Sequence, residues 1–122
     1  MQNTQTDRET FFAQYVDTLL WSETDDNGKP LDGTYSAEDV DAASLAEMRE
    51  DCDNFVTGEL QDLSDIEAGQ AGHDFALTRN RHGAGFWDRG LGDLGDRLSD
   101  AAKVYGTQGL SVGDDGVLYV HG

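Results

Sequence analysis

The chain has 122 residues, of which 37% are hydrophobic, and its formal net charge at neutral pH is −17. This length suits one domain, because two independent cores of half this size would each be marginal. No apolar run approaches the roughly 20 residues that cross a bilayer, and the polar start argues against a standard secretion signal. A field of one sign repels nucleic acid and anionic membranes, so we expect no direct binding of either.

The charge is distributed unevenly along the chain. Residues 1–67 hold eighteen acids and three bases, a net of −15, whereas residues 68–122 hold seven acids and five bases, a net of −2. The acidic half therefore favours a basic partner. An excess of Asp over Glu, eighteen to seven, also fits a GC-rich genome or adaptation to high salt, in which the carboxylates serve only solubility. The sequence leaves both explanations open.

The first predicted element is an amphipathic helix over residues 8–22, and we expect residues 1–8 before it to be frayed. Its apolar side chains form two neighbouring rows at four-residue spacing: Phe11, Tyr15 and Leu19, and Phe12, Val16 and Leu20. A loop rich in Asp, Asn and Gly follows over residues 25–33.

A second helix is predicted to begin at Ser36, an N-cap followed by acids in the first turn, and to run to about residue 57. A shorter helix is predicted over residues 59–68, ended by Gly69 and Gly72. The apolar positions that support these two helices are Val40, Leu45, Met48, Cys52, Phe55 and Val56, and then Leu60, Leu63 and Ile66.

The apolar period changes after residue 68. Residues 73–78 and 85–87 are β-compatible, and residues 79–83 between them suit a hairpin turn. A helix is predicted over residues 91–105, and a second hairpin pairs residues 110–112 with 117–120. We therefore predict one α+β domain, in which acidic helices over residues 9–68 pack with a small antiparallel sheet in a ββαββ part over residues 69–122.

The least generic segment is residues 71–92, which read AGHDFALTRNRHGAGFWDRGLG. It resembles a GHDF-x-LTRN-x-HG-x-GFWDRGLG block in small acidic proteins of tailed bacteriophages. The likeness covers roughly residues 68–119, with Ala76 in place of an expected large aromatic residue. The resemblance implies phage or prophage origin and brings no established activity. The single cysteine, Cys52, excludes an internal disulfide, so we expect the protein in the reducing cytoplasm of the host cell.

Catalytic and metal-binding motifs are weak in this segment. His73 and Asp74 match the start of a metal-dependent phosphohydrolase site, but only His82 and His121 remain as further histidines. A zinc site from Cys52, His73 and His82 would have scattered spacing, and the Asp/Gly turns lack the ligand ladder of an EF-hand. We therefore expect no catalytic residue, no metal and no cofactor.

The charged residues of the segment allow two interpretations. His73, Arg79, Asp88 and Arg89 can form an internal polar network, because charged groups near a core must be paired, or they can form a binding surface. Its large apolar residues are expected in the core: Phe75, Leu77, Phe86 and Trp87.

The candidate partner-binding residues lie in the acidic half. Glu47, Glu50 and Asp51 share one face of the second predicted helix by their spacing. Residues four apart on a helix rise about 6 Å, similar to the spacing of successive phosphates along a DNA strand. The row can therefore present carboxylates where a DNA-binding protein expects phosphates, although a solvated helix face explains it equally. The residues expected to extend it are Asp39 before the helix and Glu59, Asp62 and Asp65 after it.

These features favour a non-enzymatic phage inhibitor that binds a basic host protein at its nucleic-acid site, as anti-CRISPR and other counter-defence proteins do. A structural or accessory phage protein whose acidity serves solubility is the alternative. An enzyme built around His73, Asp74 and His82 comes third. The partner and the oligomeric state are left open by the sequence.

Overall fold

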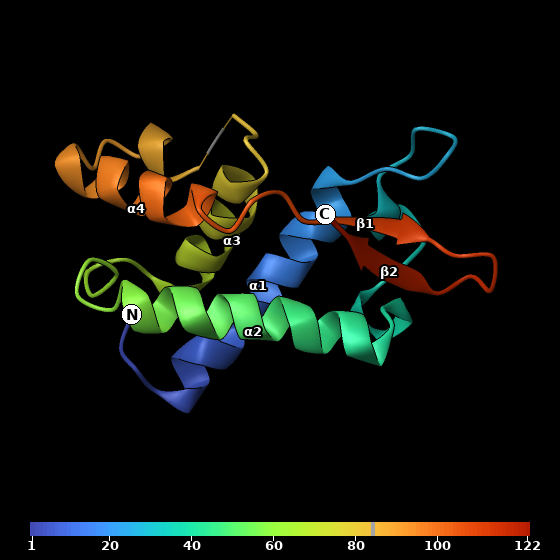
Figure 1. Cartoon of the computed structure of the whole chain (residues 1–122), viewed down its shortest axis with the longest axis horizontal. Helices are drawn as coiled ribbons and strands as arrows, with labels where there is room; N and C mark the ends of the chain where they lie inside the picture. The colour runs from blue at the N-terminus through green and yellow to red at the C-terminus, as the bar shows by residue number, and fades with distance from the viewer. Residues whose placement is uncertain (84) are drawn as a thin grey trace.

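A computed structural model describes residues 1–83 and 85–122. Four α-helices are followed by a two-stranded antiparallel sheet, which confirms the α+β class (Figure 1). The helices are α1 (Gln5–Ser22), α2 (Ala42–Gly58), α3 (Ala68–Arg79) and α4 (Asp93–Lys103). The strands are β1 (Gly109–Val112) and β2 (Leu118–His121), and single 3₁₀ turns occur at η1 (Leu31–Gly33), η2 (Ala37–Asp39) and η3 (Phe86–Asp88).

The core is formed where α1, α2 and α3 meet. Phe55 of α2 stacks on Phe75 of α3 with ring centroids 4.2 Å apart, and Phe11 of α1 lies 5.9 Å from Phe75. Offset and tilted aromatic pairs of this kind add about 0.5–1.5 kcal/mol each beyond the burial of their area. Figure 1 shows α2 lying across the front of the molecule, with α1 behind it and the sheet at one end.

The closest helix contact is that of α1 with α3. Gly72 of α3 faces the main chain of α1 so closely that a Cβ atom there would collide with the Phe11 carbonyl oxygen. Only glycine allows two backbones to approach in this way. This close contact fixes the position of α3 against α1.

The second helix begins later than predicted. Ser36 and Asp39 do form a capping box, but it closes only the single turn η2, and Val40 then returns to an extended conformation. Val40 forms a bridge with Leu118, and Asp41 caps α2 by accepting a hydrogen bond from the Ser44 amide at 3.1 Å. The capping signal was therefore correct locally and wrong as the start of the long helix.

The predicted helix over residues 59–68 is also wrong. Residues 59–65 form consecutive turns, in which the Ile66 amide donates to the Leu63 carbonyl at 3.0 Å. The chain must reverse between α2 and α3, and Glu67 then caps α3 by accepting from the Gly69 amide. Gly69 and Gly72, expected to stop a helix, lie inside the next one.

The first predicted hairpin is wrong as well. Residues 73–78 belong to α3 and residues 86–88 form η3, and among the described residues the paired strands are those of the C-terminal hairpin. Nearly every residue of α3 from Ala71 to Arg79 is buried, so the helix shows no apolar stripe that could be read from sequence. The C-terminal hairpin has the predicted place, with Leu110 opposite Val120 in the antiparallel register.

The expected fraying of residues 1–8 is not observed. Helix α1 begins at Gln5 with Thr4 as its N-cap, and the Met1 side chain is buried in the core cluster. The Met1 amino group donates to the Leu63 carbonyl at 3.0 Å, which ties the start of the chain to the turns before α3.

Candidate protein-binding surface

The exposed side of α2 carries two of the predicted partner-binding acids. Glu47 and Glu50 are both exposed, three residues apart on a helix whose other side packs into the core. Neither forms an ion pair within the described residues. These two carboxylates are therefore available to a partner.

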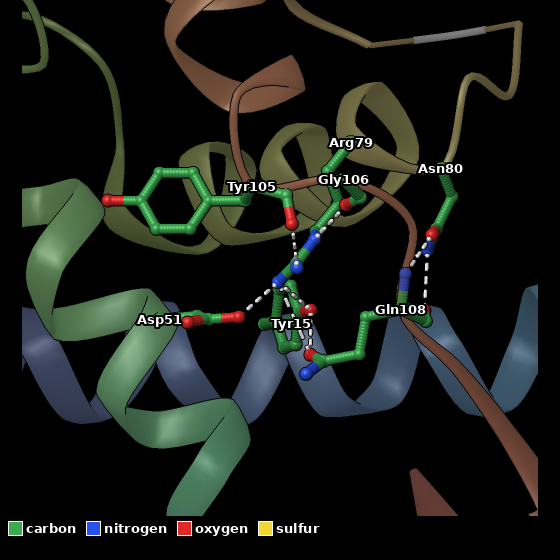
Figure 2. Close-up of polar contacts among 7 residues, drawn as sticks. All are labelled: Tyr15, Asp51, Arg79, Asn80, Tyr105, Gly106 and Gln108. Atoms are coloured by element: carbon green, nitrogen blue, oxygen red, sulfur yellow. Dashed lines mark hydrogen bonds and ion pairs between the residues drawn. The ribbon is translucent and has the colours of Figure 1, made fainter. Parts of the chain in front are cut away.

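Asp51, predicted to belong to the same row, has a different role. Its carboxylate accepts a hydrogen bond from the guanidinium of Arg79 at 2.9 Å, and the Arg79 side chain is only 2% exposed (Figure 2). A buried cation requires an opposite charge and satisfied N–H groups. The Asp51 carboxylate therefore neutralises the buried guanidinium of Arg79, and we exclude Asp51 from the binding surface.

Arg79 joins four segments of the chain. Its Nε donates to the Gly106 carbonyl at 2.9 Å and its Nη2 donates to the Tyr105 carbonyl at 3.0 Å, which fixes the chain after α4 (Figure 2). Its guanidinium also lies over the Phe75 ring. Its Nη1 faces the other acceptors, Tyr15, Asp51 and Gln108.

The neighbours of Arg79 complete this network. Asn80 both donates to the Gln108 carbonyl at 2.9 Å and accepts from the Gln108 amide at 2.7 Å, as Figure 2 shows. The Tyr15 hydroxyl donates to the Gln108 side chain at 2.5 Å, and burial raises the pKa of Tyr15, so this donor stays protonated. This network contains Arg79, one of the four residues weighed for an internal polar network, and it ties the chain before β1 to α1, α2 and α3.

A separate polar cluster surrounds Asp74, which is 1% exposed. Arg89 donates to its carboxylate through Nη2 at 2.9 Å, and Gln70 donates at 2.9 Å. The sequence pointed to Asp88 as a member of the network, but Asp88 is exposed. Asp74 takes that place and links α3 to the segment after η3.

The stability of the protein should depend on the ionisation of Asp74. Burial raises the pKa of Asp74, and the hydrogen bonds and charge of Arg89 offset this only in part. A folded-state pKa above the unfolded value means that stability is full below the unfolded pKa and falls as pH rises through the folded pKa. We therefore expect the free energy of unfolding of Asp74→Asn to increase relative to that of wild type as the pH rises from about 3 to about 7.

Urea unfolding of both proteins at the two pH values measures this gain. Asp100→Asn, an exposed position on α4, controls for the loss of one charge. A constant difference between Asp74→Asn and wild type across this pH range would contradict the prediction.

The acids predicted to extend the row lie at both ends of α2. Asp65 is exposed, and Asp39 is exposed while also accepting from the Ser36 amide at 2.9 Å. Asp62 is paired with Arg97 at 3.1 Å, and this hydrogen bond lowers the pKa of Asp62. Burial and the charge of Asp62 raise the pKa of Glu59. We therefore define the acidic face as the unpaired members of the predicted row: Asp39, Glu47, Glu50, Glu59 and Asp65.

The described residues hold few charges that could neutralise this face. Five ion pairs use five of the eight bases and five of the 25 acids, which leaves three bases and twenty acids without an ion pair. The three remaining bases are Lys29, Arg81 and Lys103. None of them lies on α2, and Arg49, the base that α2 itself carries, is paired with Glu9, so the unpaired charge of this helix is negative.

The residues weighed as metal ligands or catalytic groups are not brought together. Cys52 is buried in the core and burial raises its pKa, whereas His82 is exposed. His73 shares a hydrogen bond of 2.9 Å with Thr18. Across residues 1–83 and 85–122, no three His, Cys, Asp or Glu side chains are grouped to hold a metal ion.

The large apolar residues that were expected in the core divide into two groups. Phe75, Leu77 and Phe86 are buried as predicted, whereas Trp87 is 52% exposed and the prediction for it is wrong. Trp21 is also 56% exposed, although nothing in the helical pattern singled it out.

No protein-family model, no curated protein and no solved structure matches this chain. Among the helices within the described residues, none has the length and apolar character needed to cross a membrane. Function must therefore be inferred from the surface itself.

Proposed function

We propose that the protein is a phage-type acidic inhibitor that binds a basic, nucleic-acid-binding protein of the host cell. The observation that carries this proposal is the acidic face, where Glu47 and Glu50 stand exposed and unpaired on α2. Complementary fields steer association and select partners of opposite charge. Binding of this kind requires no catalytic group.

The length of α2 suits a groove that accepts nucleic acid. Its 17 residues extend about 25 Å at 1.5 Å per residue, close to three quarters of one turn of B-DNA. Acids at both ends, Asp39 and Asp65, continue the charge beyond the helix. A protein that binds the phosphates of DNA with Lys and Arg would therefore meet carboxylates over a length comparable to that part of the DNA.

The resemblance of residues 68–119 to small phage proteins supports a phage origin, and a phage product finds its partner in the host cell. A phage product that occupies the nucleic-acid site of a defence complex needs shape and charge only, which suits anti-CRISPR and other counter-defence proteins. Such a protein acts in the host cytoplasm. The alternative, a structural or accessory phage protein, would use the same acidity for solubility alone.

Reversal of two charges on the acidic face tests the proposal. We expect Glu47→Lys with Glu50→Lys to weaken binding to the host partner at least about tenfold, because like charges would then oppose across the interface. Both positions are exposed and Lys is as good a helix former as Glu, so the fold should be retained. The measurement is recovery of partners from host lysate on the immobilised protein, with elution by salt and by DNA.

The matched control reverses two exposed acids elsewhere, Asp26→Lys with Asp114→Lys. This variant has the same net charge as the first and should retain the partner. The proposal predicts one nucleic-acid-binding complex that is released by salt and displaced by DNA. Equal capture by both variants, or recovery of virion proteins that resist salt, would favour the structural role instead.

A further inference from the structure

A hollow of about 550 Å³ opens between α1, η1 and α3. We call it the Trp21 hollow, and the lining residues that matter here are Asp17, Trp21, Asp32, Tyr35 and His73. It shares no lining residue with the acidic face. Its walls combine aromatic rings with the exposed carboxylates of Asp17 and Asp32.

The indole of Trp21 is available to a ligand. The side chain is 56% exposed, and its ring centroid lies 6.2 Å from that of His73. The cations placed over rings within the described chain lie over Phe12, Phe75 and Tyr105, and none lies over Trp21. Trp is the aromatic side chain that attracts a cation most strongly.

Several polar groups of the Trp21 hollow can accept hydrogen bonds. The Thr18 hydroxyl donates to the Gln14 carbonyl at 2.8 Å, so its oxygen is left to accept from Nδ1 of His73. In the neutral imidazole this assigns the hydrogen to Nδ1 and leaves Nε2 as an acceptor. Asp17 and Asp32 form no ion pair within the described residues.

We propose that the Trp21 hollow binds the guanidinium group of an arginine side chain. That this arginine belongs to the basic partner rests on the proposed function above. A guanidinium is planar, stacks on an indole and presents a fork of N–H donors that carboxylates and a ring nitrogen can accept. A lysine ammonium is more strongly hydrated and cannot stack. A nucleic-acid base could stack on Trp21, but the two aspartates repel its phosphates.

A short peptide provides the test. We would titrate ¹⁵N-labelled Trp87→Phe protein, in which Trp21 gives the one indole N–H signal, with acetyl-Gly-Arg-Gly-amide. The proposal predicts saturable shifts of the Trp21 indole signal and of the Thr18 and His73 amides. The lysine peptide should bind more weakly, and the citrulline peptide, which has the same shape without the charge, should produce no saturable shift.

Substitution of the two carboxylates provides the second measurement. The double substitution Asp17→Asn with Asp32→Asn should lower the affinity for the arginine peptide by about threefold to tenfold. The double substitution Asp26→Asn with Asp114→Asn should leave this affinity unchanged. Both pairs remove two charges, so general attraction to an acidic protein is controlled. Because the probe is a peptide, these results do not depend on the outcome of the lysate capture that tests the acidic face. Equal binding of the citrulline peptide, or shifts spread over α2 and absent from Trp21, would overturn the proposal.

Discussion

Replacement of Arg79 by methionine is expected to lower the free energy of unfolding by about 3–5 kcal/mol. Methionine fills much of the space of the side-chain stem but leaves the carbonyls of Tyr105 and Gly106 without their donor. It also leaves the carboxylate of Asp51 without its cation in a partly buried site. Removing one partner of a buried pair costs more than the pair contributes, because the other group stays desolvated. Urea unfolding followed by circular dichroism measures the loss.

Arg97→Met is the matched control for this substitution. Arg97 pairs with Asp62 at 3.1 Å, but its side chain is 59% exposed. Water replaces an exposed partner at little cost, so only a small change in the unfolding midpoint is expected. If the two variants unfolded at the same urea concentration, the Arg79 network would contribute no more than a surface ion pair.

The network also changes the design of charge-reversal experiments. Asp51 lies on α2 directly after Glu50 in sequence and would be an obvious third site for a reversal to lysine. Such a variant would place a cation against buried Arg79, so loss of binding would follow from loss of the fold. Glu47 and Glu50 avoid this ambiguity because neither has an ion-pair partner in the described residues.

Helix α1 and most of α2 could be predicted because their buried residues recur at helical spacing, whereas the predicted helix over residues 59–68 was wrong. Phe11, Tyr15 and Leu19 recur every four residues and are all buried, so the end of α1 was predicted correctly and its start was placed three residues late. The C-terminal hairpin was predicted because the Gly113–Gly116 turn separates two short apolar runs, and Gly116 adopts the left-handed φ of +78°. In both cases a local signal and the tertiary contacts agree.

Helix α3 could not be predicted in this way. It is buried on almost all sides, and its Gly72 lowers helix propensity in exchange for close contact with α1. Phe75, Leu77 and Thr78 are also favourable in strands, so the local pattern favoured the wrong element. Only the tertiary contacts determine that this segment is helical.

The candidate site could be predicted in its location but not in its members. Sequence spacing correctly placed Glu47, Glu50 and Asp51 on one helix. It could not show that Asp51 neutralises Arg79, because these residues are 28 positions apart and meet only in the fold. For the same reason the Trp21 hollow, built from α1, η1 and α3, left no pattern in the sequence.

Gly72→Ala is expected to lower the free energy of unfolding by about 1–3 kcal/mol, and toward the upper end of that range. The added Cβ would meet the carbonyl of Phe11, which is main chain and cannot move aside as a flexible side chain can. Helices α1 and α3 would have to separate along their most extensive contact, loosening the ring contacts of Phe75 with Phe11 and Tyr15. Gly58→Ala, at the end of α2 where a Cβ meets nothing within 4 Å, should instead stabilise by about 0.5 kcal/mol. Urea unfolding of both variants measures the contrast. A stabilising effect at both glycines would mean that close packing of α1 on α3 does not determine the helical state of residues 68–79.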